Sequence, residues 1–279
     1  MRMPIKLNER TWPRILTALI PSSDDPRGLI ENGLHGEQFS KLISVFKFGN
    51  TFKTTKSLRF PATLETIASL QFETLPVVLD VGASDGMTSL DVIRRIPFKK
   101  YYVTDLNVDI FYDFRDGTYY FYDTNFDCIL VTTKWFVVYS DIKGSLFPFG
   151  LLVKYFFSKS VSRKDNLIRL ELINPEVKKL NGNVIIAKYD IFKRWTREKV
   201  DLVLVANLLN SRYFTNQQII NAVQNMIKAL KEGGRLVIVE NRGNEQGTIF
   251  RIEKRKIYDE TNINGGTEIR NLILHAGLK

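Results

Sequence analysis

Short apolar runs recur along the chain, and connections rich in polar residues or glycine separate them. The clearest run is Val77–Val81, which is apolar or β-branched except for Asp80, closes on a glycine and predicts a strand buried on both faces. Four further runs have similar character: Tyr101–Thr104, Val184–Ala187, Leu202–Ala206 and Arg235–Val239. Strands alternating with longer connections predict an α/β fold with a mostly parallel sheet.

Two segments between these runs have the periodicity of amphipathic helices. Apolar residues in Met87–Ile96 fit a helix that ends before Pro97. From Thr215 to Leu230 the apolar residues form one stripe, and Thr215 with Gln218 offers a capping box at its start. Both segments are expected to be crossover helices of the sheet.

Three regions lie outside this alternating pattern. Residues 1–75 are predicted to be an N-terminal helical addition, and residues 76–279 a Rossmann-like domain. Residues 108–183, between the second and third core strands, are too long for a simple loop and predict a β-rich insertion followed by the aromatic segment Leu146–Phe157. At the end of the chain, Thr248–Lys256 and Glu268–Leu274 are predicted to pair as an antiparallel hairpin around Asn264–Gly266.

The amino-acid composition limits which kinds of functional site are expected in this chain. The sequence of 279 residues has one cysteine, Cys128, and two histidines, His35 and His275, so neither a disulfide framework nor a metal site is expected. No signal peptide and no stretch long enough to span a membrane is recognised, which favours a cytoplasmic location. The net charge of +10 is spread along the chain, so nucleic acid is an allowed partner that is not favoured.

The candidate cofactor-binding residues begin in the first core strand and continue into the loop after it. Asp80-Val81-Gly82-Ala83-Ser84-Asp85-Gly86 joins that strand to a helix, where glycines let the backbone turn and approach a ligand. The spacing G-x-x-x-G matches neither the dinucleotide fingerprint nor the phosphate-binding loop of nucleotide triphosphatases. A different nucleotide-like cofactor is therefore expected at this loop.

The stretch VLDVGASDG resembles motif I of class I S-adenosylmethionine-dependent methyltransferases. The resemblance covers residues 76–107 and 184–279 and implies a seven-stranded sheet that ends in an antiparallel hairpin, with S-adenosylmethionine as cofactor. It implies that Asp80 orients the loop or the methionine end of the cofactor, and that Gly82 through Gly86 line it. Asp105 resembles the acidic residue that binds the ribose hydroxyls, and Asp190 with Ile191 resembles the pair that contacts the adenine.

Asn207 follows the fourth predicted strand, at the end that faces the methyl acceptor in this family, and we place it nearest the reacting centre. Two roles have alternatives that stay open. Asp85 either lines the cofactor or caps the following helix, and Asn207 either faces the acceptor or forms a strand-end turn. The aromatic residues of the insertion form either a lid over the acceptor or the core of an added subdomain.

The acceptor itself is not identified by any motif. The stretch ANLLNSRYF is loosely similar to one in chemotaxis receptor-glutamate methyltransferases, but it departs at Ala206 and has extra residues before Tyr213. No histidine near the motifs offers a general base. The sequence therefore predicts methyl transfer to a small molecule or protein side chain. An RNA methyltransferase, or a peripheral membrane-associated, cofactor-binding protein without catalysis, is the alternative.

Overall fold

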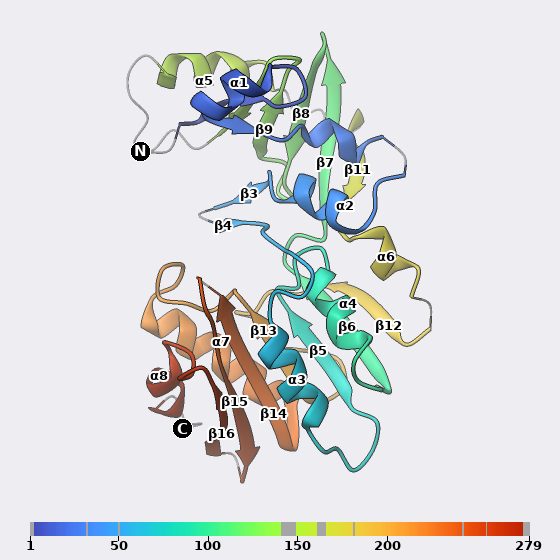
Figure 1. Cartoon of the computed structure of the whole chain (residues 1–279), viewed down its shortest axis with the longest axis vertical. Coiled ribbons are helices and arrows are strands. Elements are labelled where there is room, and N and C mark those ends of the chain that lie inside the picture. The colour runs from blue at the N-terminus through green and yellow to red at the C-terminus, as the bar shows by residue number, and fades with distance from the viewer. Residues whose placement is uncertain are drawn as a thin grey trace. The chain divides into compact units, whose positions relative to one another are not determined.

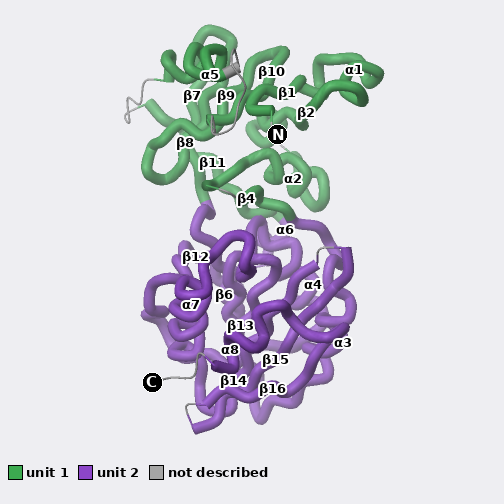
Figure 2. The backbone as a smooth tube through the Cα atoms, turned by 90° about the vertical axis from the view of Figure 1, so that its left-hand side faces the viewer, with its two compact units in different colours: residues 1–54, 109–175 green, residues 55–108, 176–279 purple. Residues whose placement is uncertain are grey.

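In the computed structural model, the chain forms two compact units, each built from two separate stretches of sequence (Figure 2). Unit 1 contains residues 1–54 and 109–175, and unit 2 contains residues 55–108 and 176–279. The structure describes residues 3–31, 33–49, 51–140, 149–160, 166–180, 182–241, 243–254 and 256–275.

Unit 2 is organised around a seven-stranded sheet with the order β12-β6-β5-β13-β14-β15-β16 (Figure 1). Its strands are, in chain order, β5 (Val77–Val81), β6 (Lys100–Asp105), β12 (Val184–Lys188), β13 (Val200–Ala206), β14 (Leu230–Asn241), β15 (Glu245–Glu253) and β16 (Lys256–Ile263). The first five are parallel neighbours, whereas β15 is antiparallel to both β14 and β16. The predicted α/β sheet with a C-terminal antiparallel hairpin is confirmed.

Helices pack on both sides of this sheet, as the two views show (Figures 1 and 2). On one side lie α3 (Pro61–Ser69) and α4 (Met87–Ile93), and on the other lies α7 (Asn216–Ala229). The predicted capping box of α7 is present, because Thr215 accepts from the backbone of Gln218 and the Gln218 side chain accepts from the backbone of Thr215. The buried stripe of α7 joins the apolar strand residues in one core.

The predicted boundaries of the terminal hairpin are wrong. The turn lies after Glu253, where Lys254 has a φ of 48°, and Arg270–His275 forms the helix α8. Ile269 and Ile273 are four residues apart and both are buried in the core, a spacing that suits one face of a helix. Burial on that helical face outweighed the β-branched composition of the segment.

Unit 1 has its own seven-stranded sheet, with the order β11-β7-β8-β9-β10-β1-β2. Its strands are β1 (Ile5–Asn8), β2 (Ser22–Ser23), β7 (Asp109–Arg115), β8 (Thr118–Tyr122), β9 (Cys128–Thr132), β10 (Phe136–Tyr139) and β11 (Ile168–Glu171). The predicted meander of the insertion is confirmed, and β1 from the N-terminal region pairs antiparallel with β10.

The remaining elements of unit 1 are short: α1 (Arg14–Leu19), η1 (Pro26–Leu29), α2 (Gly36–Ile43), β3 (Lys47–Phe48), β4 (Thr51–Phe52) and α5 (Phe149–Ser158), and α6 (Pro175–Lys178) spans the border with unit 2. The described part of residues 1–75 therefore holds four short strands as well as helices. Tyr120, Phe121 and Tyr122 of the insertion are buried in the two apolar cores of unit 1. Many of the aromatic residues of the insertion thus stabilise a separate subdomain.

Candidate functional site

The glycine loop joins the carboxyl end of β5 to the start of α4. Gly82 and Gly86 have φ values of 70° and 89°, a region that L residues rarely adopt, and Ser84 lies there too with a φ of 60°. A Cβ on Gly82 would lie 2.5 Å from Cδ2 of Leu208, and one on Gly86 would lie 2.8 Å from Cγ2 of Val177. Backbone geometry therefore favours glycine at both positions, and an added Cβ would also have to displace a neighbouring side-chain end.

Asp105, the last residue of β6, holds the glycine loop through its side chain. Its Oδ2 accepts a 2.9 Å hydrogen bond from the backbone N–H of Ser84, and its Oδ1 accepts one of 2.8 Å from Asn107. The backbone N–H of Ala83 donates to the carbonyl of Thr104 at 2.9 Å. The loop and the carboxylate predicted to act with it are thus in direct contact.

Asp190 and Ile191 follow β12, which neighbours β6 with Lys188 opposite Asp105. Asp190 is partly exposed, and its Oδ1 accepts a 3.0 Å hydrogen bond from the backbone of Phe192. Ile191 is buried in the core of unit 2, and its carbonyl accepts from Nδ2 of Asn225. The strand register brings Asp190 to the same edge of the sheet as Asp105, whereas the Ile191 side chain packs among apolar residues.

Asp80 is buried within β5, beneath the loop. Its Oδ2 accepts hydrogen bonds from Oγ of Ser89 at 2.7 Å and from the hydroxyl of Tyr101 at 3.0 Å. Burial raises the pKa of Asp80 to about 6, although both hydrogen bonds lower it. The carboxyl group ties β5 to α4 and β6, so it supports the loop from below.

Asp85 is fully buried, and its Oδ1 accepts a 3.1 Å hydrogen bond from the backbone N–H of Met87, the first residue of α4. This bond satisfies one of the N–H groups that a helix start leaves without a partner in the helix. Asp85 thus contacts the first turn of α4 from the residue before its N-cap, Gly86.

Asn207 follows β13 and has a φ of 54°, which suits a strand-end turn. Its Oδ1 accepts a 2.7 Å hydrogen bond from the backbone of Asn241, and its backbone N–H donates to the carbonyl of Val239. Within the described part of the chain, its Nδ2 is buried and has no hydrogen-bond partner. Asn207 thus forms the turn, and its amide nitrogen is a buried donor without a partner among the described residues.

Arg59 lies at this same strand end, and no sequence motif pointed to it. Its guanidinium donates to the carbonyl of Asn241 at 3.3 Å, and the Asn241 side chain donates back to the carbonyl of Arg59 at 3.0 Å. Burial lowers the pKa of Arg59. The segment before α3 therefore brings a half-buried cation to Asn241, the residue that bonds Asn207, a long-range placement that local sequence patterns do not encode.

The order of the strands explains why these groups share one place. From β5 the chain builds β6 and β12 outward on one side, and it then returns to build β13 and β14 on the other side of β5. The loops after β5 and β13 therefore leave the sheet in opposite directions, and in open α/β sheets such a switch point forms a crevice for ligands. Gly82 and Asn207 stand at this switch point.

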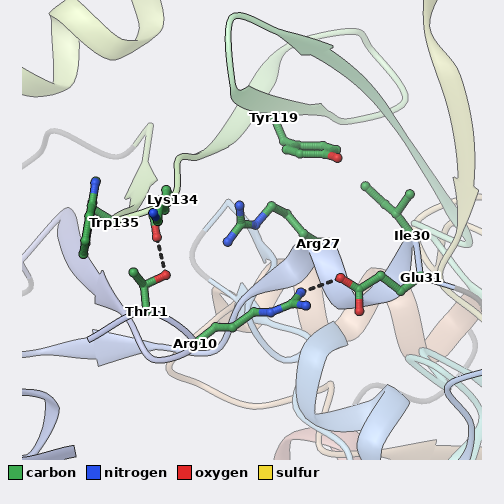
Figure 3. Close-up of a pocket in the computed structure, with 8 residues that line it drawn as sticks. All are labelled: Arg10, Thr11, Arg27, Ile30, Glu31, Tyr119, Lys134 and Trp135. Carbon is green, nitrogen blue, oxygen red and sulfur yellow. Dashed lines mark hydrogen bonds and ion pairs between the residues drawn. The ribbon is translucent and has the colours of Figure 1, made fainter. Parts of the chain in front are cut away.

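A cavity of about 760 Å³ lies in unit 1. Its wall carries three cations and two aromatic rings, together with one acid; these are Arg10, Arg27, Lys134, Tyr119, Trp135 and Glu31. Figure 3 shows the Arg10 guanidinium paired with Glu31, and the Tyr119 ring on the other side of Arg27. Asp25 accepts several hydrogen bonds from Arg27, so much of the positive charge here is already compensated.

Neither a metal-binding cluster nor a membrane-spanning helix is found among the described residues. No group of three or more His, Cys, Asp or Glu side chains in these ranges is arranged to hold a metal ion. No helix among them is long and apolar enough to cross a membrane.

No protein-family model matches the sequence, and no curated protein is similar to it at a significant level. Many solved structures of S-adenosylmethionine-dependent methyltransferases match the fold over about 65% of the chain. An O-methyltransferase family protein from Burkholderia thailandensis matches 64% of this chain and 37% of its own, with 14% identity and a TM-score of 0.35.

SibL, an S-adenosylmethionine-dependent methyltransferase, matches 64% of this chain and 35% of its own, with 16% identity and a TM-score of 0.33. The N-methyltransferase NodS from Bradyrhizobium japonicum, in complex with S-adenosyl-L-homocysteine, matches 66% of this chain and 62% of its own, with 17% identity and a TM-score of 0.35. The chain thus spans between about a third and two thirds of these proteins. At these identities the similarity concerns the fold alone.

Proposed function

We propose that unit 2 binds S-adenosylmethionine at the glycine loop and transfers its methyl group to an acceptor at the ends of β13 and β14. The observation that carries the proposal is the hydrogen bond between Ser84 and Asp105, which places a carboxylate directly on a glycine loop at the switch point of the sheet. Asp190 lies at the end of the next strand along the same edge.

The donor set suits an adenosyl group. A carboxylate oxygen accepts more than one hydrogen bond, so Asp105 can hold Ser84 and still accept from a ribose diol. Asp190 is partly exposed and suits the exocyclic amine of an adenine. Leu208 lies over Gly82, but the contact is made by the flexible end of its side chain, which can rotate away. The contact of Ile191 with the adenine ring remains a prediction.

When bound, the cofactor supplies an electrophilic methyl group, so the protein's main task is to hold and align the acceptor. Asn207 has a buried amide donor for this purpose, and Arg59 adds a cation at the same strand end. Asp80 does not serve as the base, because its carboxyl group is 1% exposed and is held by Ser89 and Tyr101. The acceptor is proposed to be a small molecule or a protein side chain.

Calorimetric titration with S-adenosylmethionine and with S-adenosyl-L-homocysteine tests the cofactor assignment. We expect micromolar affinity, about −8 kcal/mol, and a loss of at least tenfold in Asp105→Ala. Asp123→Ala is the matched control, because Asp123 accepts a similar hydrogen bond from the backbone two residues on but lies in unit 1. No binding to the native protein, or equal binding by Asp105→Ala, contradicts the proposal.

RNA is the second candidate acceptor, and the net charge of +10 is the observation that favours it. We expect structured RNA to shift in electrophoretic mobility when the protein is added, and the affinity of the protein for RNA to fall steeply as the salt concentration rises. Absence of such a shift at low salt eliminates this candidate.

A further inference from the structure

Helix α1 of unit 1 exposes apolar side chains to an unusual degree. Ile15 and Leu19 are 77% and 78% exposed, and they lie four residues apart, on one face of the helix. No residue of α1 is buried, so this helix contributes little to the core of unit 1. A helix with its apolar residues turned outward is typical of an interaction surface.

Helix α5, which is longer than α1, also exposes apolar side chains. Its inner face is anchored by Val153, which is 1% exposed and packs with Tyr120 and Tyr122. On the opposite side, Leu151 and Tyr155 are 56% and 57% exposed, and Leu152 beside them is 46% exposed. The outer face of α5 is therefore apolar, although burial of Val153 already holds the helix in place.

An exposed tryptophan adjoins α1. Trp135, 44% exposed, lies in the turn between β9 and β10, and its carbonyl accepts a 2.8 Å hydrogen bond from Nε1 of Trp12. The two indole rings are 5.3 Å apart and meet edge to face. The ammonium group of Lys134 lies 5.0 Å from the centre of the Trp135 ring, and both residues also line the cavity of Figure 3.

Cations outnumber acids beside these apolar groups, although Glu31 pairs with Arg10 and Glu9 accepts a hydrogen bond from Ser22. The segment of residues 10–23 contains Arg10 and Arg14 and no acid, and the segment of residues 149–160 contains Lys154 and Lys159 and no acid. Figures 1 and 2 both show α1 and α5 at one end of unit 1, with α2 at the other end. The two helices that carry these apolar and cationic residues thus lie at the same end of the unit.

We propose that this end of unit 1, formed by α1, α5 and Trp135, docks on the surface of an anionic phospholipid bilayer. Apolar side chains of short surface helices enter the boundary between headgroups and acyl chains, tryptophan prefers that boundary, and lysine and arginine attract anionic headgroups. The apolar groups lie on two separate helices with cations beside them, which suits a broad anionic surface. The inference does not depend on the methyltransferase proposal.

Vesicle flotation tests the docking surface with the full chain. We expect flotation with vesicles made of equal parts of phosphatidylcholine and phosphatidylserine, and little flotation with phosphatidylcholine alone. The double variant Leu19→Glu/Leu151→Glu should lower the partition coefficient at least about tenfold. Leu75→Glu is the matched control, since Leu75 is also an exposed leucine, at 53%, but belongs to unit 2, and it should float like the native protein.

Circular dichroism of each variant checks that the fold is retained, and the exposure of the substituted leucines gives no reason for it to be lost. The charge variant Lys154→Gln/Lys159→Gln should lose its preference for phosphatidylserine and give a weaker salt dependence. The proposal is overturned by absence of flotation with the anionic vesicles at low salt, or by equal flotation of Leu19→Glu/Leu151→Glu. It is also overturned if the native protein does not bind vesicles and light scattering shows that it is a dimer which Leu19→Glu/Leu151→Glu dissociates.

Discussion

The carboxylate of Asp105 accepts a hydrogen bond of 2.9 Å from the backbone N–H of Ser84, so the end of β6 holds the loop that follows β5. Ser84 has a φ of 60°, a conformation that L residues adopt only at a cost. The hydrogen bond offsets part of this cost and fixes the direction of the loop. A single contact therefore joins the two features that the resemblance assigns to cofactor binding.

Gly82→Ala should destabilise the protein more than an ordinary substitution of glycine with a positive φ. The left-handed backbone alone costs about 1 to 2 kcal/mol for alanine, and the approach of Leu208 to 2.5 Å adds a steric term. Gly233→Ala is the control, because Gly233 has a φ of 75° and nothing within 4 Å of the added Cβ. Urea denaturation should show a larger loss for Gly82→Ala; equal losses would contradict the close approach.

Asp80→Asn should change how stability depends on pH. Burial raises the pKa of Asp80 from 3.8 to about 6, so the folded protein keeps a proton that the unfolded chain loses between these values. Stability from this group is fully present below pH 4 and is lost as the pH rises through 6. The sign is opposite to that of an ion-paired carboxylate.

This change in unfolding free energy is about 3 kcal/mol, because each unit of the shift in pKa corresponds to about 1.36 kcal/mol. Asparagine keeps an acceptor for Ser89 and Tyr101 but does not titrate. The difference in unfolding free energy between the native protein and Asp80→Asn, measured from pH 4 to 7, should therefore fall through this range and level off above 6. A constant difference would mean that the pKa of Asp80 is the same in the folded protein and in the unfolded chain.

Glu245→Ala should loosen the start of α3. The Glu245 carboxylate is 8% exposed and accepts from the backbone N–H groups of Ala62 and Thr63, at 3.0 and 2.6 Å. Hydrogen bonds to a charged group contribute about 1.5 to 3 kcal/mol each, and the negative charge also suits a helix N-terminus. Glu245→Gln keeps one acceptor oxygen and should lose less stability than Glu245→Ala. If the two variants unfold at the same urea concentration, the charge and the second bond contribute nothing.

Local patterns were sufficient to predict the parallel strands, α7 with its cap, and the glycine loop, because each depends on residues close in sequence. They did not reveal that β1 pairs with β10, since nothing near Ile5 marks a partner more than a hundred residues away. The terminal hairpin was misplaced because Asn264–Gly266 has the composition of a hairpin turn, whereas the spacing of Ile269 and Ile273 is helical.

The direction of a side chain was harder to predict than its position in a strand. Asp80 and Asp105 both belong to the predicted site, but Asp80 points into the core beneath the loop, whereas Asp105 reaches the loop itself. Arg59 was missed entirely, because its place beside Asn241 depends on how the segment before α3 crosses the end of the sheet. Such placements arise from tertiary packing and have no local signature.

Leu208→Ala tests whether the space beside Gly82 serves a ligand. Leu208 is partly buried against the core, so its truncation should lower the unfolding free energy by about 1 to 3 kcal/mol. Because its side chain lies over Gly82, the truncation should also raise the affinity for S-adenosyl-L-homocysteine, measured by calorimetry.

Leu272→Ala is the matched control, since Leu272 is also a partly buried leucine packed against the same core, but on α8. It should lower stability to a similar extent and leave the affinity unchanged. A lower affinity in Leu208→Ala would show that Leu208 packs against the ligand and does not cover its site. An equal affinity in both leucine variants, with binding retained, would place the ligand away from Gly82.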